Sequence, residues 1–143
     1  MTGHEATARV EIAAPAERVW AALTDPDLIA QYMFGSRVES DWRPGSPITW
    51  SGEFDGKPYQ DRGTVLEVEP GKRLVVTHFS PLSGQEDVPE NYHTVRYDLS
   101  GSGSGATTLT LTQDNSASAE EAEQFSKNWQ AMLDGLRGVV ESR

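Results

Sequence analysis

Cysteine is absent from this chain of 143 residues. Its absence excludes disulfides, thiolate nucleophiles and cysteine-based zinc sites. Only three histidines are present, so we expect neither a structural metal nor a metal cofactor. A chain without cysteine fits a reducing cytosol, although this observation alone does not fix the compartment.

Basic residues are few. Twelve lysines and arginines stand against 22 acidic residues, which gives a net charge of -10. This balance disfavours a nucleic-acid partner, which needs a basic footprint, and an anionic membrane surface. The acidity favours solubility as its first explanation, and an acidic face for a basic protein partner is the alternative.

Long apolar runs are also missing. No stretch approaches the ~20 apolar residues of a membrane-spanning helix. Residues 1–7 lack the apolar segment of a secretory signal, so the expected location is the cytoplasm. The length suits one domain spanning residues 1–143, with its core at about residues 8–142.

The residues that are present begin with short helical and extended patterns. Alternation of apolar and polar residues over 8–13 predicts a strand, and Pro15 is well placed to begin a helix. Asp25 and Pro26 end that helix, and a second short helix follows and ends near Gly35.

Extended patterns dominate from residue 36 to residue 115. Turn signals at Asp55-Gly56, at Pro70-Gly71 and in the glycine- and serine-rich segment 101–105 separate them. The loop-like segment 80–91 is expected to be mobile. The strands that we predict cover residues 37–39, 48–54, 59–69, 73–79, 93–99 and 107–113.

A long amphipathic helix is predicted over residues 117–142, capped by Ser116 or Ser118. Its apolar stripe must pack on a broad surface, and the concave face of the sheet is the one available. The stripe contains Ala122, Phe125, Trp129, Met132, Leu136 and Val139.

This order predicts an α+β fold. A curved antiparallel sheet of six to seven strands wraps around the long C-terminal helix, with two short helices between strands 1 and 2. The chain shows no βαβ alternation, so a parallel sheet is not expected.

Four local phrases resemble one superfamily. They are residues 15–26 (PAERVWAALTDP), 63–77 (GTVLEVEPGKRLVVT), 105–113 (GATTLTLTQ) and 129–136 (WQAMLDGL). The chain is thereby identified as a member of the START-like helix-grip superfamily, in a branch that resembles the C-terminal domain of the activator of Hsp90 ATPase. The resemblance implies a cavity between the sheet and the long helix. It does not choose a function, because the superfamily includes lipid carriers, hormone binders, cyclases and co-chaperone domains.

Candidate cavity residues follow from strand alternation and from the helix stripe. Rings with a polar edge suit a pocket for an amphipathic molecule, and a histidine or glutamine on an apolar face is a candidate polar anchor. The alternative for each is an ordinary core position. The candidates are Trp50, His78, Tyr97, Gln113, Phe125 and Trp129.

Other chemical signals are weak. We expect Asp55, Asp61, Glu67 and Glu69 to be exposed, because none forms a sheltered acid–base pair in the sequence pattern. Glu90 and His93 match a metal-binding spacing only on a helix, and here the second residue begins a strand. Arg62 and Arg96 are expected to be solvated, and His4 to lie in a frayed terminus.

The sequence leaves three functions open. The first is binding of a small hydrophobic or amphipathic ligand in the grip cavity. The second is a protein-interaction module related to the Hsp90 activator, and a homodimer is also compatible with the pattern. The third is a cyclase- or dehydratase-like enzyme, for which only His78 is a fair candidate base.

Overall fold

The computed structural model describes residues 3–33, 35–54, 56–81, 84–101 and 105–142. The elements follow the predicted order, with a short 3-10 helix added before the sixth strand. They are β1 (His4–Ile12), α1 (Ala16–Thr24), α2 (Pro26–Tyr32), β2 (Arg37–Ser40), β3 (Pro47–Phe54), β4 (Lys57–Glu69), β5 (Arg73–His78), η2 (Pro89–Asn91), β6 (His93–Gly101), β7 (Thr107–Ser116) and α3 (Ala119–Glu141).

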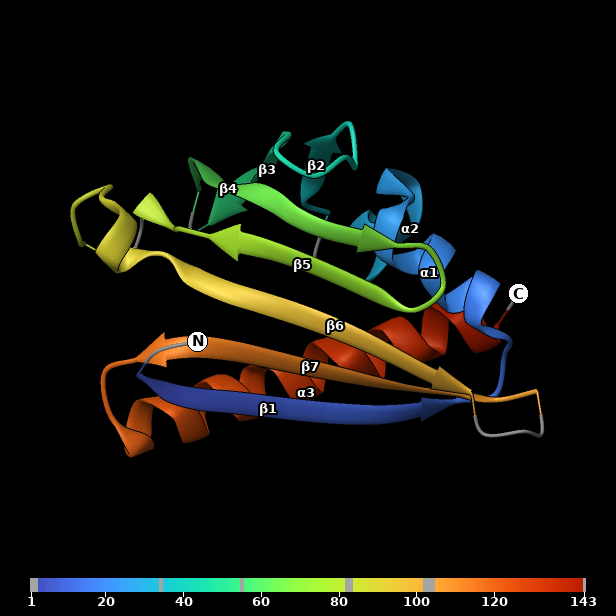
Figure 1. Cartoon of the computed structure of the whole chain (residues 1–143). Coiled ribbons are helices and arrows are strands. Elements are labelled where there is room, and N and C mark those ends of the chain that lie inside the picture. Colours follow the sequence, from blue (N-terminus) through green and yellow to red (C-terminus); the bar gives the residue numbers. More distant parts are fainter. Residues whose placement is uncertain (1–2, 34, 55, 82–83, 102–104, 143) are drawn as a thin grey trace.

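The strands form one seven-stranded sheet in the order β1-β7-β6-β5-β4-β3-β2. Every neighbouring pair is antiparallel. The sheet is curved, and Figure 1 shows α3 crossing behind β6, β7 and β1, with α1 and α2 near its C-terminal end. The predicted α+β helix-grip fold is therefore confirmed.

The ends of the elements explain how the chain turns. Asp25 accepts a hydrogen bond from the Asp27 amide at 2.9 Å and so caps α2. Ser118 accepts one from the Glu121 amide at 3.1 Å, which identifies Ser118 as the cap of α3.

The expectation of a frayed His4 is wrong, because β1 pairs His4 with the end of β7.

A β-bulge in β4 reverses which side chains face the interior. Val65 pairs with Val76, but Glu67 pairs with Val75, so Leu66 is the extra residue. The Leu66 side chain consequently points outward and is 48% exposed. Before the bulge, alternation from the buried Val65 directs Asp61 inward as well.

The long helix α3 has two different halves. Leu133, Leu136 and Val140 are almost completely buried in the C-terminal half, where they complete the core. In the N-terminal half, Phe125 and Trp129 are only partly buried. The predicted stripe thus found the gripped face but missed Leu133 and Val140, which carry its deepest contacts.

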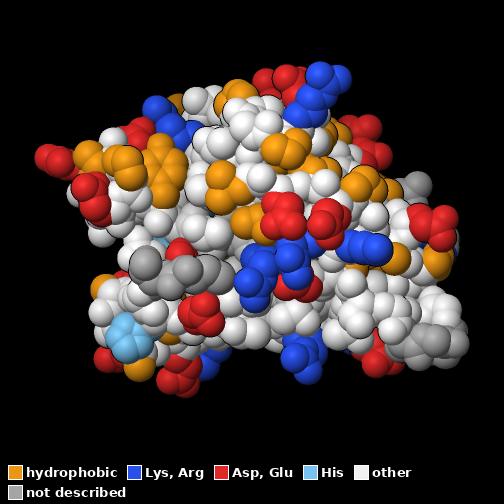
Figure 2. All heavy atoms as spheres, in the orientation of Figure 1, with side chains coloured by type: hydrophobic (Ala, Val, Ile, Leu, Met, Phe, Trp, Pro, Cys, Tyr) orange, Lys and Arg blue, Asp and Glu red, His pale blue; other side chains and the backbone are white. Residues whose placement is uncertain are grey.

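The outer face of the sheet is charged. Figure 2 shows acidic and basic side chains lying beside one another on the face turned toward the viewer in Figure 1. Asp98 receives hydrogen bonds from Arg73 at 2.7 Å and Arg96 at 2.9 Å, and Arg62 pairs with Asp87 at 3.1 Å. Pairs this exposed contribute little stability. As expected, Arg62 and Arg96 do not turn into the grip.

Two predicted turns lie partly outside the described residues. In the turn predicted at Asp55-Gly56, Asp55 lies outside the described residues, and Gly56 has a positive φ of 77°. In the glycine- and serine-rich turn predicted over 101–105, residues 102–104 lie outside them. No helix among the described residues has both the length and the apolar character needed to cross a membrane.

Candidate functional site

A cavity of about 570 Å³ lies between the inner face of the sheet, α2 and the N-terminal half of α3. It reaches the surface at the exposed Glu53 and Asn128. Its lining residues are Tyr32, Met33, Ser36, Glu53, Tyr59, Asp61, His78, His93, Gln113, Phe125, Asn128, Trp129 and Met132.

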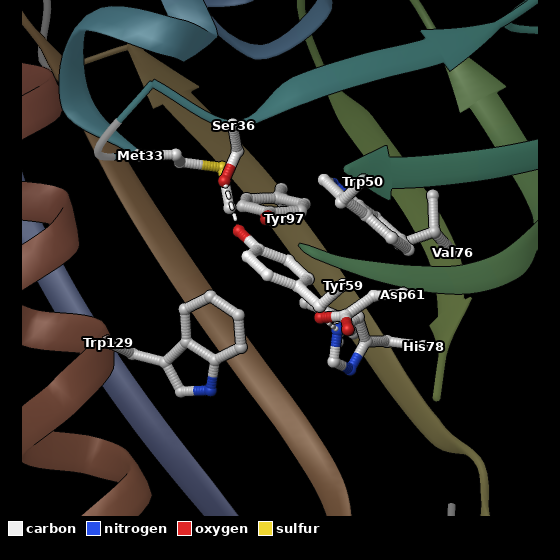
Figure 3. A pocket seen from close by; sticks show the side chains of 10 residues that line it. Met33, Ser36, Trp50, Tyr59, Asp61, Val76, His78, Tyr97 and Trp129 are labelled. Carbon is white, nitrogen blue, oxygen red and sulfur yellow. Dashed lines mark hydrogen bonds and ion pairs between the residues drawn. The ribbon is translucent and has the colours of Figure 1, made fainter. Parts of the chain in front are cut away.

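A smaller inner cavity of about 60 Å³ continues from it toward the core. Figure 3 shows this inner end, with Trp129 on α3 facing Tyr59, Asp61 and His78 on the sheet. The two spaces share Met33, Ser36, Tyr59, Asp61, His78 and Trp129 in their walls.

The residues predicted for the site all line these cavities. Trp50 and Tyr97 border the inner end, Gln113 and Phe125 border the outer one, and His78 and Trp129 border both. Strand alternation brings the sheet residues to one face, and α3 lies across that face. Binding by these residues remains a prediction, but the sequence identified a group of residues that meet in space.

The Asp61–His78 pair is the main polar feature of the wall. His78 Nε2 lies 2.9 Å from Asp61 Oδ2, and the side chains are only 23% and 16% exposed. The expectation of an exposed Asp61 is therefore wrong. A carboxylate accepts, so Nε2 donates, and in the corresponding neutral tautomer of the imidazole Nδ1 carries the lone pair. Such a carboxylate-oriented imidazole can accept a proton at Nδ1.

Two ring residues, Trp50 and His93, lie beside this pair. The Trp50 ring meets His78 edge-on, with ring centroids 5.0 Å apart. His93 lies directly opposite His78 in the β5–β6 ladder. Its Nδ1 donates to the Asp114 carbonyl oxygen at 2.9 Å, and its ring meets Phe125 edge-on at 5.6 Å.

Gln113 joins the sheet to the helix. Trp129 Nε1 donates to Gln113 Oε1 at 2.7 Å. An indole N–H can only donate, so this bond determines which end of the amide holds the oxygen. Gln113 is 2% exposed, and its Nε2 has no hydrogen-bond acceptor among the described residues.

Two glycines allow the strands to approach closely at the site. A Cβ at Gly63 would lie 1.8 Å from the Thr77 carbonyl oxygen, next to His78. A Cβ at Gly52 would lie 2.9 Å from the Tyr59 hydroxyl. Glycine at 52 therefore leaves room for that hydroxyl, which shares a hydrogen bond of 2.6 Å with Ser36.

Asp61, Tyr59 and Ser36 are lining residues that the sequence reasoning missed. A signal for the first two was available, because counting back from Val65 in steps of two gives Gly63, Asp61 and Tyr59. No comparable signal marks Ser36, which lies just before β2 and is brought inward by the turn after α2.

Burial affects two tyrosines that line the cavities, Tyr97 at the inner end and Tyr32 in the outer cavity. Burial raises the pKa of the Tyr97 hydroxyl well above its usual range. Burial also raises the pKa of Tyr32, with a smaller contribution from Tyr97, and the Tyr32 hydroxyl donates to the Ala22 carbonyl at 2.6 Å. Both groups therefore stay neutral in the folded protein well above neutral pH.

The walls thus combine aromatic rings with a few hydrogen-bonding groups, as in a small-molecule site. Within the described ranges, no group of three or more potential metal ligands is present.

A family model described as activator of Hsp90 ATPase homolog 1-like protein matches residues 13–141. None of the curated proteins matches the sequence. Among solved structures, ChR145 from Cytophaga hutchinsonii is 43% identical, with a TM-score of 0.86 and coverage of 99% of this chain and 97% of that chain.

Two more distant structures share the fold. The Aha1 dimer from Colwellia psychrerythraea is 20% identical, with a TM-score of 0.73 and coverage of 96% of both chains. CalU16 from Micromonospora echinospora is 22% identical, with a TM-score of 0.70 and coverage of 98% of this chain and 87% of that chain.

Proposed function

The chain belongs to the activator of Hsp90 ATPase homolog 1-like family of the START-like superfamily, and we propose that it binds a small hydrophobic or amphipathic ligand between the sheet and α3. The observation that carries this proposal is the cavity of about 570 Å³. Its volume falls in the range of small-molecule sites, roughly 300–1,000 Å³.

The composition of the wall supports the same proposal. Phe125, Trp129 and Met132 offer apolar surface from α3. Opposite them, the sheet supplies Asp61 and Gln113, each with a buried polar atom that lacks a partner among the described residues. Such an atom costs about 1–3 kcal/mol. A ligand with a polar head group and an apolar tail can supply the partner while its tail covers the rings.

Decanol is a suitable first probe, because it combines one hydroxyl with a flexible apolar chain. We expect it to bind saturably and to raise the melting temperature, since a ligand of the folded state stabilises it. Asn128 is exposed at the mouth of the cavity, so Asn128→Trp should obstruct entry without disturbing the core. We expect this variant to bind decanol about tenfold more weakly.

Lys127→Trp is the matched control. Lys127 is the preceding residue on α3, is exposed and does not line the cavity. This variant should bind decanol as the parent protein does. Absence of saturable binding to the parent, or equal binding by the Asn128→Trp variant, would contradict the proposal.

A protein-interaction role is the second candidate, and family membership favours it. The family model is named for an activator of the Hsp90 ATPase, and the related structure from Colwellia psychrerythraea is a dimer. The net charge of -10 suits a basic partner surface. The candidate predicts that the purified chain changes the ATPase rate of a chaperone, and an unchanged rate would remove it.

A further inference from the structure

We propose that the cavity selects amphipathic ligands whose head group is a protonated amine, with the Asp61 carboxylate as its partner. This inference rests on the proposed function and specifies the ligand class. It follows from the charges in the cavity wall, the hydrogen bonding of the Asp61 carboxylate and the aromatic rings near it.

The formal charges in the wall have one sign. Asp61 and Glu53 are the acidic residues that line the outer cavity. Neither cavity has a lysine or arginine among its described lining residues. Counted by the same formal convention as the net charge of the chain, the wall carries two negative charges, so its potential attracts a cation and repels an anion.

The histidines do not reverse this preference. His78 directs its Nε2 at Asp61, and His93 directs its Nδ1 at the Asp114 carbonyl oxygen. If His78 takes up a proton, its charge is balanced by the carboxylate that it already contacts. An anionic head group would therefore lose its hydration shell without gaining a cationic partner.

The two carboxylate oxygens of Asp61 differ in their hydrogen bonding. Oδ2 accepts from His78, whereas Oδ1 is buried and receives no hydrogen bond from the described residues. A hydrogen bond from a charged donor stabilises a buried carboxylate oxygen more than it stabilises an oxygen exposed to solvent, because water does not compete for the buried oxygen. An ammonium group supplies both the donor and the charge.

Aromatic rings favour the same head group. Tyr59 and Trp129 line both cavities together with Asp61, and Figure 3 shows the three side chains on facing walls. The faces of tyrosine and tryptophan rings attract cations, and the attraction is stronger where water is excluded. A neutral alcohol gains little from these rings, and a carboxylate is repelled by their negative faces.

The test compares decylamine, decanol and decanoate, which share one tail and differ in head group. Affinities are measured by isothermal titration calorimetry at neutral pH and low salt. We expect decylamine to bind at least about tenfold more tightly than decanol, and decanoate to bind most weakly. Asp61→Asn should lower decylamine affinity about tenfold and change decanol affinity by about twofold or less.

Asp134→Asn is the matched control, because Asp134 is exposed on α3, lies outside both cavities and loses the same charge. It should leave the order of affinities unchanged. Equal affinities for the three probes, tightest binding of decanoate, or equal loss in the two variants would overturn the amine inference while leaving cavity binding intact. Binding of none of the probes would instead overturn the proposed function.

Discussion

At the scale of residues, polarity inside the grip depends on pairs that join distant parts of the chain. Asp61 meets His78 across two strands, and Gln113 meets Trp129 across the gap between sheet and helix. In both pairs one polar atom is satisfied and another is not. A ligand that forms a hydrogen bond with one of these unpaired atoms gains the most binding free energy.

The sequence predicted one member of the Asp61–His78 pair and not the other. His78 follows apolar Leu74 and Val76 on an alternating strand, so its inward direction was readable. Asp61 lies on the same side of the β4 bulge as the buried Val65 and shares its face, so its inward direction was also readable, although its neighbours Gln60 and Arg62 are polar. Only the tertiary structure shows that its carboxylate lies beside His78.

Tyr97 yields a prediction at this scale. Burial raises its pKa above the unfolded value of about 10, so above that pH the unfolded chain releases a proton that the folded protein retains. Stability is therefore unaffected below about pH 10 and falls as the pH rises beyond it, by up to about 1.4 kcal/mol per pH unit for this group.

Replacing Tyr97 with phenylalanine removes this proton. We expect a shallower loss of stability above pH ~10 in the Tyr97→Phe variant, measured as the free energy of unfolding in urea across the alkaline range. Tyr32, whose pKa is also raised, should keep some of the dependence in place. Parallel pH curves for the two proteins would show that Tyr97 does not hold its proton in the folded state.

At the scale of elements, the C-terminal half of α3 packs into the core and its N-terminal half lines the cavity. Leu136 is fully buried in the C-terminal half, whereas Phe125 is partly exposed in the cavity wall of the N-terminal half. The stripe was readable from the sequence. The difference between the two halves was not readable, because a helical pattern shows which face is apolar but not whether the sheet packs directly against that face.

This division predicts different outcomes for two truncations on one helix. Leu136→Ala should lower the free energy of unfolding by about 2–5 kcal/mol and leave the affinity of the remaining folded protein for decanol nearly unchanged. Phe125→Ala should cost less stability and weaken decanol binding. Denaturant unfolding and calorimetric titration of both variants provide the comparison, and the reverse pattern would refute the division.

At the scale of the whole molecule, the order of elements was predictable because each element has its own local pattern. Alternation, helical periodicity and turn residues acted together, and the resulting antiparallel sheet and long helix are those expected. The size of the space between them was not predictable. It depends on the curvature of the sheet and on where α3 crosses it, and no local sequence pattern specifies either.

The central claim is that the space between the sheet and α3 takes up an amphipathic molecule. Proton–nitrogen correlation spectra recorded during titration with decanol test it most directly. We predict saturable shifts of the Trp129 indole N–H and of the Gln113 side-chain amide, which line the cavity, while the Trp20 indole N–H, which lies outside it, stays in place. Shifts confined to the outer face of the sheet, or no shifts at all, would contradict the claim.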